Sequence, residues 1–343
     1  MIHLFSLVLL GVFMVPSLVS AQWTEPAYTN ELRTAPLAAN PPPVTASARY
    51  VDNQLPGGTD CPASPPGSTY NAALRNCTGN DGQAWNTIAE ALANLTAGQR
   101  AYIRGGTEYN TGNLTAANSG TAGNYITLSR YPGDPRPVWN CNGNTFCIAD
   151  SWNRSYWVFD GLELKNSTQQ LVVFLSANNV TNIWFINGVY HDSSHIGGPL
   201  NGSYAGMYII AAQTVFSNNE FYNNPMSPLL LWGGHHSIIE FNQIHDNGSN
   251  DDDAGAVKCG ADIYACIMRY NTLWNNYRFV GATGPCFSGG VNCTGVYCLY
   301  YDYAADDLHG TTSYMYNNIC FDNDSGLQAN RMPTVGIFNN LVY

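Results

Sequence analysis

Trp157-Val-Phe-Asp-Gly-Leu-Glu-Leu164 is the first of seven similar segments that follow one another to the end of the chain. The other six are Trp184-Phe-Ile-Asn-Gly-Val-Tyr190, Val215-Phe-Ser-Asn-Asn-Glu-Phe221, Ile238-Ile-Glu-Phe-Asn-Gln-Ile244, Ile267-Met-Arg-Tyr-Asn-Thr-Leu273, Tyr314-Met-Tyr-Asn-Asn-Ile-Cys320 and Val335-Gly-Ile-Phe-Asn-Asn-Leu341. Each segment has one short apolar stretch before a turn residue and a second one after it. The turn residues are Gly161, Gly188, Asn219, Asn242, Asn271, Asn318 and Asn340. Self-similarity of this kind indicates a repeat architecture.

The repeats indicate an all-β fold, a right-handed parallel β-helix in which each repeat forms one coil about 4.8 Å above the previous one. Asn suits the turn position because it tolerates left-handed backbone, and because its amide can hydrogen-bond to the same amide one coil away. Leucine-rich repeats would need a stricter period and more Leu. Propeller blades would need antiparallel hairpins with tight two-residue turns. A second row of residues follows four positions after the turn residues: Lys165, Asp192, Asn223, Asp246, Asn275 and Asp322.

Composition divides the chain into three parts: a signal peptide at 1–21, a leader rich in Pro, Ala and Thr at 22–80, and the β-helix domain at 81–343. The apolar run Leu4 to Val15 is too short for a membrane span, and Val19-Ser20-Ala21 offers small residues for cleavage. No later run reaches the roughly 18 apolar residues of a transmembrane segment. We therefore expect a secreted protein that starts at Gln22.

Both ends of the predicted solenoid have distinctive sequences. Thr87 and Glu90 match a helix capping box, and the residues after Thr87 place apolar side chains on one helical face. The sequence thus predicts a short helix that caps the first coil, preceded by an extended, partly disordered leader held by one disulfide. The chain stops inside a repeat after Leu341, which suggests a truncated C-terminus. We expect a monomer, with self-association if the cut leaves an apolar edge.

The chain has ten cysteines, which fits an oxidising compartment. They occur as neighbours in sequence: Cys61 and Cys77, Cys141 and Cys147, Cys259 and Cys266, Cys286 and Cys293, and Cys298 and Cys320. We expect the disulfides Cys61–Cys77 and Cys141–Cys147 in particular, because each closes a short loop outside the repeats. Glycosylation sequons begin at Asn76, Asn94, Asn113, Asn153, Asn166, Asn179, Asn201, Asn247, Asn292 and Asn323, so a eukaryotic host could produce a glycoprotein.

Charge excludes one class of partner. Only 11% of the 343 residues are charged, the net charge is −11, and no block of Lys and Arg occurs. A nucleic-acid partner is excluded because phosphate binding needs clustered positive charge. The protein would also repel an acidic polymer unless a cation bridged the two locally.

Several stretches resemble known secreted proteins. Asp81-Gly-Gln-Ala-Trp-Asn-Thr-Ile88, Ala101-Tyr-Ile-Arg-Gly-Gly-Thr107 and Tyr131-Pro-Gly133 resemble the first coils of the pectate-lyase-like superfamily of β-helix proteins. Leu229 to Asp246, Asp252 to Ala256 and Tyr300-Tyr-Asp302 are similar to β-helix glycoside hydrolases that act on fucosides or xylan. The resemblance covers roughly residues 80 to 343. It implies a carbohydrate-active enzyme with a polysaccharide substrate, and it leaves the reaction type open.

Ionisable residues gather in two stretches that break the repeat, Asn247 to Cys259 and Tyr277 to Thr312. Asp251 and Asp253 alternate along an extended segment, so both can point the same way and bind Ca²⁺ through oxygen ligands. Lys258 follows, and the pattern Asp-x-Asp-x-x-x-x-Lys resembles calcium-dependent polysaccharide lyases. In β-elimination of a uronic-acid polymer, a cation neutralises the sugar carboxylate and a base such as Lys258 removes the ring proton. The alternatives are a solvated acidic loop and a lysine in an ion pair.

A glycoside hydrolase is the competing interpretation, with Asp253 and Asp302 as its paired carboxylates. After the segment Asp253 to Ala256 such hydrolases tend to carry a Tyr and an Arg, whereas this chain has Lys258 and Ala261, which disfavours this interpretation. His309 is a candidate proton donor. Aromatic residues that could stack on sugar rings, or pack between coils instead, are Trp232, Trp274, Tyr277, Tyr300 and Tyr301. A non-catalytic carbohydrate-binding or structural β-helix is the third possibility.

Overall fold

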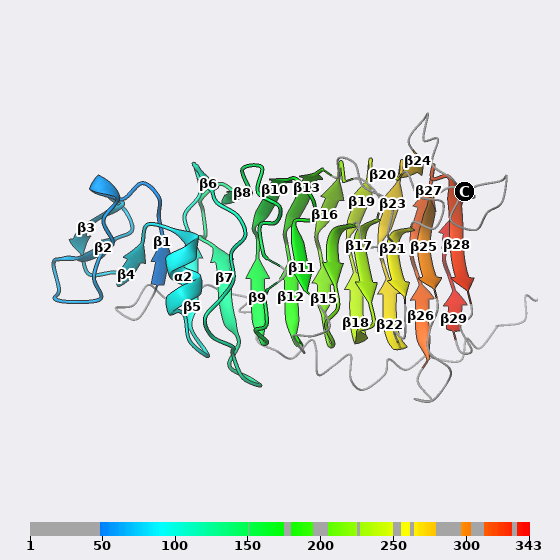
Figure 1. Cartoon of the computed structure of the whole chain (residues 1–343), viewed down its shortest axis with the longest axis horizontal. Helices are drawn as coiled ribbons and strands as arrows, with labels where there is room; N and C mark the ends of the chain where they lie inside the picture. The colour runs from blue at the N-terminus through cyan, green and yellow to red at the C-terminus, as the bar shows by residue number, and fades with distance from the viewer. Residues whose placement is uncertain are drawn as a thin grey trace, which may run out of the picture.

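A right-handed parallel β-helix is observed in the computed structural model, as the repeats predict (Figure 1). The structure describes residues 49–149, 151–174, 180–194, 205–224, 227–249, 255–260, 264–278, 296–302, 312–330 and 335–343. The expected signal peptide at 1–21 lies outside these residues. Within the described part, no helix is long and apolar enough to span a membrane.

Three parallel sheets form the faces of the solenoid in the described residues. The 11-stranded sheet runs, in spatial order, through β29 (Val335–Phe338), β26 (Ser313–Tyr316), β22 (Tyr264–Arg269), β18 (His235–Glu240), β15 (Val215–Ser217), β12 (Ile183–Ile186), β9 (Trp157–Asp160), β7 (Ile126–Arg130), β5 (Arg100–Ile103), β1 (Arg49–Val51) and β4 (Gln83–Trp85). The 9-stranded sheet contains β30 (Leu341–Val342), β27 (Ile319–Phe321), β23 (Thr272–Trp274), β19 (Gln243–His245), β16 (Glu220–Tyr222), β13 (Val189–Ser193), β10 (Glu163–Ser167), β8 (Val138–Asn140) and β6 (Glu108–Asn110). The 6-stranded sheet contains β11 (Val172–Phe174), β14 (Ala205–Ile209), β17 (Ser227–Trp232), β21 (Gly255–Gly260), β25 (Tyr297–Asp302) and β28 (Ser325–Asn330).

Smaller elements complete the described chain. They are the 3₁₀ helix η1 (Pro56–Gly58), the helix α2 (Ile88–Asn94), the antiparallel pair β2 (Thr69–Asn71) and β3 (Asn76–Gly79), and the parallel pair β20 (Gly248–Ser249) and β24 (Tyr277–Arg278). A full coil passes from the 11-stranded sheet to the 9-stranded sheet and then to the 6-stranded sheet, as in β12, β13 and β14. Successive coils therefore place equivalent residues directly above one another.

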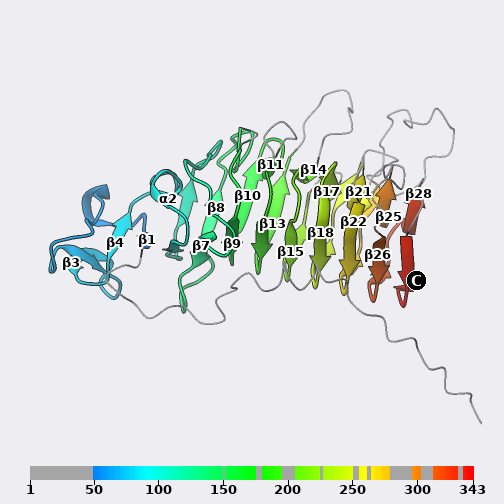
Figure 2. The same ribbon diagram turned by 90° about the horizontal axis from the view of Figure 1, so that it is seen from below.

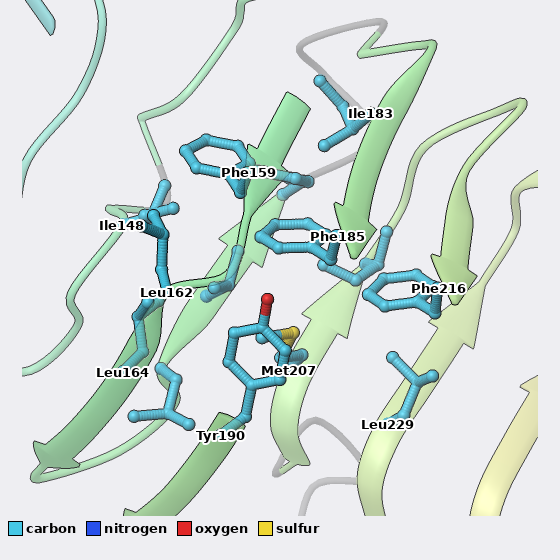
Figure 3. Close-up of a cluster of buried hydrophobic side chains, with 14 of the residues drawn as sticks. Ile148, Phe159, Leu162, Leu164, Ile183, Phe185, Tyr190, Met207, Phe216 and Leu229 are labelled. Carbon is cyan, nitrogen blue, oxygen red and sulfur yellow. The ribbon is translucent and has the colours of Figure 1, made fainter. Parts of the chain in front are cut away.

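The interior of the solenoid is filled by stacked apolar side chains (Figure 3). Phe159, Phe185 and Phe216 occupy the same register position of β9, β12 and β15. Their ring centroids are 4.9 and 5.3 Å apart, and the rings are nearly parallel. Each such pair stabilises the fold by about 0.5–1.5 kcal/mol beyond the burial of its surface.

An asparagine ladder runs along the first corner, between the 11-stranded and the 9-stranded sheets. The side-chain amide of each ladder residue donates to the amide oxygen of the next, and the members are Asn219, Asn242, Asn271, Asn318 and Asn340. Gly188 precedes them and donates its backbone N–H to Asn219. The predicted amide contacts between coils are thus confirmed.

The left-handed backbone of this corner is one residue earlier than expected. Positive φ occurs just before the ladder residue, as at Asn218 and Asn317, and also at the bulky residues Phe241 and Tyr270. The ladder side chain must point inward to reach the next coil, so the preceding residue makes the bend. Left-handed backbone costs a bulky residue roughly 1–2 kcal/mol. Phe241 and Tyr270 stack at 5.0 Å on the surface, which offsets part of that cost.

A second asparagine ladder, which the sequence analysis missed, lies at the corner after the 9-stranded sheet. Its members Asn224, Asn247, Asn276 and Asn323 are again linked by amide hydrogen bonds. Left-handed residues precede them at Asn223, Asp246, Asn275 and Asp322, and Asp192 has the same backbone before Ser193, which donates to Asn224. All five belong to the row noted in the sequence. The Asn247 side chain is not accessible for glycosylation in the folded protein, because it is buried and its amide donates to the backbone carbonyls of Phe221 and His245.

The fold begins earlier than the boundary at residue 81 that composition predicts. Strand β1 lies between β4 and β5 in the 11-stranded sheet, so part of the predicted leader belongs to the solenoid. The buried Asp52 accepts hydrogen bonds from Tyr70 and Arg75, and Arg104 also contacts Tyr70. Composition concealed this because the segment is rich in Pro, Ala and Thr, and its buried side chains, such as Tyr50, Leu55 and Tyr70, are widely spaced along it.

The predicted helix is confirmed as α2, including its capping box. The Thr87 side chain accepts from the backbone of Glu90, and the Glu90 carboxylate accepts from the backbone of Thr87. The buried residues Ile88, Ala91 and Leu92 pack into the main core. The helix thereby covers apolar side chains at the N-terminal end of the coils.

Both specifically predicted disulfides, Cys61–Cys77 and Cys141–Cys147, are present. Two further pairs of sequence neighbours are also bonded, Cys259–Cys266 and Cys298–Cys320. Cys286 and Cys293 lie outside the described residues. None of the described cysteines is free.

Candidate functional site

Lys258 and Asp302 form an ion pair on the outer face of the 6-stranded sheet. The Lys258 Nζ lies 3.0 Å from Asp302 Oδ2, and each side chain is 8% exposed. Lys258 belongs to β21 and pairs in register with Tyr300 of β25, so Asp302 lies two residues further along the neighbouring strand. Residues 44 positions apart in sequence are therefore joined by the stacking of two consecutive coils.

Strand alternation explains why this pair faces outward. Val257 and Cys259 flank Lys258 and belong to the solenoid core, as do Leu299 and Tyr301 on β25. Successive side chains of a strand point to opposite faces, so Lys258, Tyr300 and Asp302 share the other face. The two charges lie outside the core and are nevertheless largely shielded from water.

Two aromatic rings shield Lys258. Its Nζ lies 4.7 Å from the Tyr300 ring centroid and 5.5 Å from that of Trp232 on β17. Gly260 lies in register between Trp232 and Asp302, and a Cβ there would come within 2.5 Å of the indole. A side chain at Gly260 would thus displace Trp232. Cation–aromatic contacts of this kind contribute about 0.5–2 kcal/mol.

A third residue orients the Lys258–Asp302 ion pair. The side-chain amide of Asn330 on β28 donates a hydrogen bond to Asp302 Oδ1 at 3.4 Å. Removing one member of a buried ion pair typically costs 3–5 kcal/mol, because the other charge is left uncompensated. Substitutions here must therefore preserve the charge if they are to report on chemistry rather than folding.

Of the five aromatic residues predicted to bind substrate, two lie at the ion pair and three lie elsewhere. Trp232 and Tyr300 lie at Lys258, as the sequence analysis expects. Trp274 lies on the 9-stranded sheet between His245 and Phe321, at ring distances of 4.2 and 5.9 Å.

The other two residues have local partners of their own. The exposed Tyr277 donates a 2.5 Å hydrogen bond to Asp322, which raises the pKa of Tyr277 to about 12. Tyr301 cannot bind substrate as predicted, because it is buried in the core with its hydroxyl 2.8 Å from the Cys266 and Tyr314 carbonyl oxygens. Its neighbour in sequence faces outward, and strand alternation turns Tyr301 inward.

The predicted calcium ligands Asp251 and Asp253 lie outside the described residues, as does His309. Among the described residues, no group of three or more His, Cys, Asp and Glu side chains could hold a metal ion. Asp302, the nearest described carboxylate to Lys258, is already engaged in the ion pair. The described residues therefore do not fit a calcium ion, and calcium stays a prediction.

An outer row of polar and aromatic side chains on the 9-stranded sheet escaped the sequence analysis. His191 and His245 each contact two carboxylates, namely Glu163 and Asp192 in one case and Glu220 and Asp246 in the other. Between them lies Tyr222, whose ring is stacked on both imidazoles. The only sequence signal was the repeat of His-Asp at the ends of β13 and β19.

His191 predicts a pH dependence of stability. Burial disfavours the imidazolium, but hydrogen bonds to Glu163 and Asp192 outweigh it and raise the pKa of His191 above its ordinary value. The contribution of His191 is thus fully present below the unfolded-state pKa of about 6.5, and it is lost as pH rises through the folded-state pKa. Denaturant titrations should show His191→Gln destabilising the protein more at about pH 5.5 than at about pH 8.5. Equal destabilisation at both pH values would contradict this assignment.

Comparisons with known proteins show similarity of structure only. No protein-family model matches the sequence, and no curated protein matches it. Pectate lyase Pel9A is similar over 86% of this chain and 78% of its own, with 15% identity and a TM-score of 0.45. An alginate lyase from Paenibacillus sp. str. FPU-7 is similar over 74% of this chain and 96% of its own, with 11% identity and a TM-score of 0.34. The GH136 lacto-N-biosidase from Eubacterium ramulus is similar over 86% and 67%, with 11% identity and a TM-score of 0.33.

Proposed function

We propose that the protein is a secreted enzyme that cleaves an acidic polysaccharide by β-elimination, with Lys258 as the base and Asp302 as its positioning residue. The observation that supports this is the Lys258–Asp302 pair, shielded by Trp232 and Tyr300 on the outer face of the 6-stranded sheet. Lys258 is one of only 13 basic residues in a chain of net charge −11, and in this proposal calcium rather than the lysine would neutralise the uronate carboxylate.

The reaction follows from the chemistry of a uronic-acid ring. Neutral Lys258 would take the proton from the ring carbon beside the carboxylate, and the electron pair of that C–H bond becomes a carbon–carbon double bond. The glycosidic C–O bond breaks, and its oxygen leaves and takes a proton from solvent. Asp302 would hold the amine in place, since a fixed base loses less orientational freedom on reaction. Calcium at Asp251 and Asp253 is part of this proposal and supplies neutralisation of the substrate carboxylate when bound.

A glycoside hydrolase is the second candidate, favoured by the presence of the Asp302 carboxylate itself at the site. In that mechanism Asp302 and Asp253 would act as the two carboxylates, one as acid and one as nucleophile or base. Because Lys258 and Asp302 are in contact, removing either disturbs both. Loss of activity in such a variant therefore does not separate the two mechanisms, whereas the product does.

The product assay uses pectin, alginate, a glycosaminoglycan and xylan, each with calcium and with a chelator. A lyase leaves an unsaturated uronate that absorbs ultraviolet light, and we expect this product from an acidic polymer in the presence of calcium. Reducing ends without absorbance, from xylan or from any of the acidic polymers, would establish hydrolysis and contradict the lyase. No product from any polymer, with circular dichroism showing a folded protein, would favour a non-catalytic carbohydrate-binding role.

A further inference from the structure

A polar groove of about 570 Å³ lies at the corner that follows the 9-stranded sheet. It spans five coils, because Gly143 after β8 and residues at the ends of β10, β13, β16 and β19 line it. Figure 2 shows these coils stacked in sequence along the solenoid. The volume is in the range of small-molecule sites, about 300–1,000 Å³.

The groove presents one polar side chain per coil in a regular row. Asn166, Asp192, Asn223 and Asp246 all have left-handed backbone, with φ between 50 and 61°, and all line the groove. Coils repeat about every 4.8 Å, which is close to the length of one sugar residue in an extended chain. A linear glycan lying along the solenoid could therefore meet an equivalent side chain at every residue.

Both carboxylates in the row are held in fixed orientations. Asp192 accepts hydrogen bonds from His191 and Asn223, one on each oxygen. Asp246 is bonded in the same way by His245 and Asn275. Their side chains are still 36% and 50% exposed. Each carboxylate oxygen has a second lone pair, so both groups can still accept a hydrogen bond from a sugar hydroxyl without the entropy cost of being ordered.

The groove's charge and composition select the ligand class. Among the described residues, its lining contains hydroxyls, amides and two carboxylates, and no Lys, Arg or aromatic side chain. The two carboxylates would repel anionic sugars and phosphates. Vicinal hydroxyls, which both donate and accept, match this set.

We propose that this groove binds an uncharged, hydroxyl-rich glycan chain along the solenoid axis. The site is separate from the Lys258–Asp302 pair, and its assignment does not depend on that pair being catalytic. It gives the protein a contact with neutral polysaccharide in addition to the acidic substrate proposed above.

The test measures binding of xylohexaose, mannohexaose, cellohexaose and a hexagalacturonate to the full chain by isothermal titration calorimetry. N-glycans are removed enzymatically first, because the sequon Asn166-Ser-Thr168 lies in the groove. We expect at least one neutral hexamer to bind, with about tenfold or greater weakening in the double variant Asp192→Asn/Asp246→Asn as charged acceptors become neutral. Asp322→Asn is the matched control, since Asp322 has the same left-handed backbone and lies outside the groove lining.

Two results would overturn the proposal. One is the failure of every neutral hexamer to bind. The other is binding that the double variant Asp192→Asn/Asp246→Asn retains at full strength, which would place the sugar outside the groove. Binding that weakens in the double variant and persists in Lys258→Arg supports the groove whether or not the lyase proposal holds.

Discussion

Lys258→Arg is expected to lower the turnover number on an acidic polysaccharide by about 10²- to 10⁴-fold, the usual contribution of a general base. Arginine preserves the positive charge and can still pair with Asp302, so the buried charge is not left alone. A guanidinium does not release its proton at any working pH and cannot act as the base. The measurement is the rate of ultraviolet-absorbing product formation, together with thermal unfolding to establish that the variant is folded.

The matched control is Arg269→Lys, the reverse exchange in another buried ion pair. Arg269 contacts Glu240 at 2.6 Å on the 11-stranded sheet, with the two side chains 2% and 8% exposed. This variant should keep its turnover number, because it changes a buried cation away from the site. If Lys258→Arg kept a rate within about tenfold of the wild type, Lys258 would not be the base and Asp302 would become the leading catalytic candidate.

Asn271→Ala should destabilise the protein by about 3–5 kcal/mol, which is large for one substitution. The Asn271 amide donates to the Ile239 carbonyl and to Asn318, and its oxygen accepts from the backbone and side chain of Asn242. Alanine removes all four bonds and leaves buried partners unsatisfied, each at a cost of about 1–3 kcal/mol. Equilibrium unfolding in urea measures the effect.

Asn110→Ala is the corresponding control, because Asn110 is an exposed residue of β6. Its free energy of unfolding should stay within about 0.5 kcal/mol of the wild type. A similar small effect for Asn271→Ala would show that the ladder is not an important source of stability.

Much of the fold could be predicted because a solenoid repeats its constraints along the sequence. The apolar pattern around Phe185 recurs around Phe159 and Phe216, and the three residues occupy equivalent positions in successive coils. The Thr87–Glu90 capping box was also readable, since its contacts join residues three positions apart. β1 could not be found in this way, because Arg49–Val51 lies before the first of the seven repeats and shares none of their turn residues.

The candidate site was only partly predictable. Lys258, Asp302, Trp232 and Tyr300 were all selected from the sequence, yet as members of competing mechanisms rather than as one cluster. The exact register of β17, β21 and β25 brings them together, and Gly260 makes room for the indole. Tyr301 was misassigned because a shift of one residue along a strand reverses the face on which a side chain lies.

The sequence by itself determined the repeat of the coil: the inward positions of Phe159, Phe185 and Phe216, the first row of asparagine residues and the disulfides Cys61–Cys77 and Cys141–Cys147. These properties depend on local periodicity, and the same pattern recurs in each of the repeats. The tertiary structure alone decided which outward-facing residues share a surface. Contacts such as Lys258 with Asp302, or Asp192 with Asn223, join different coils. Their partners are set by the length of chain in each coil, which varies from repeat to repeat, so only the stacked structure can specify them.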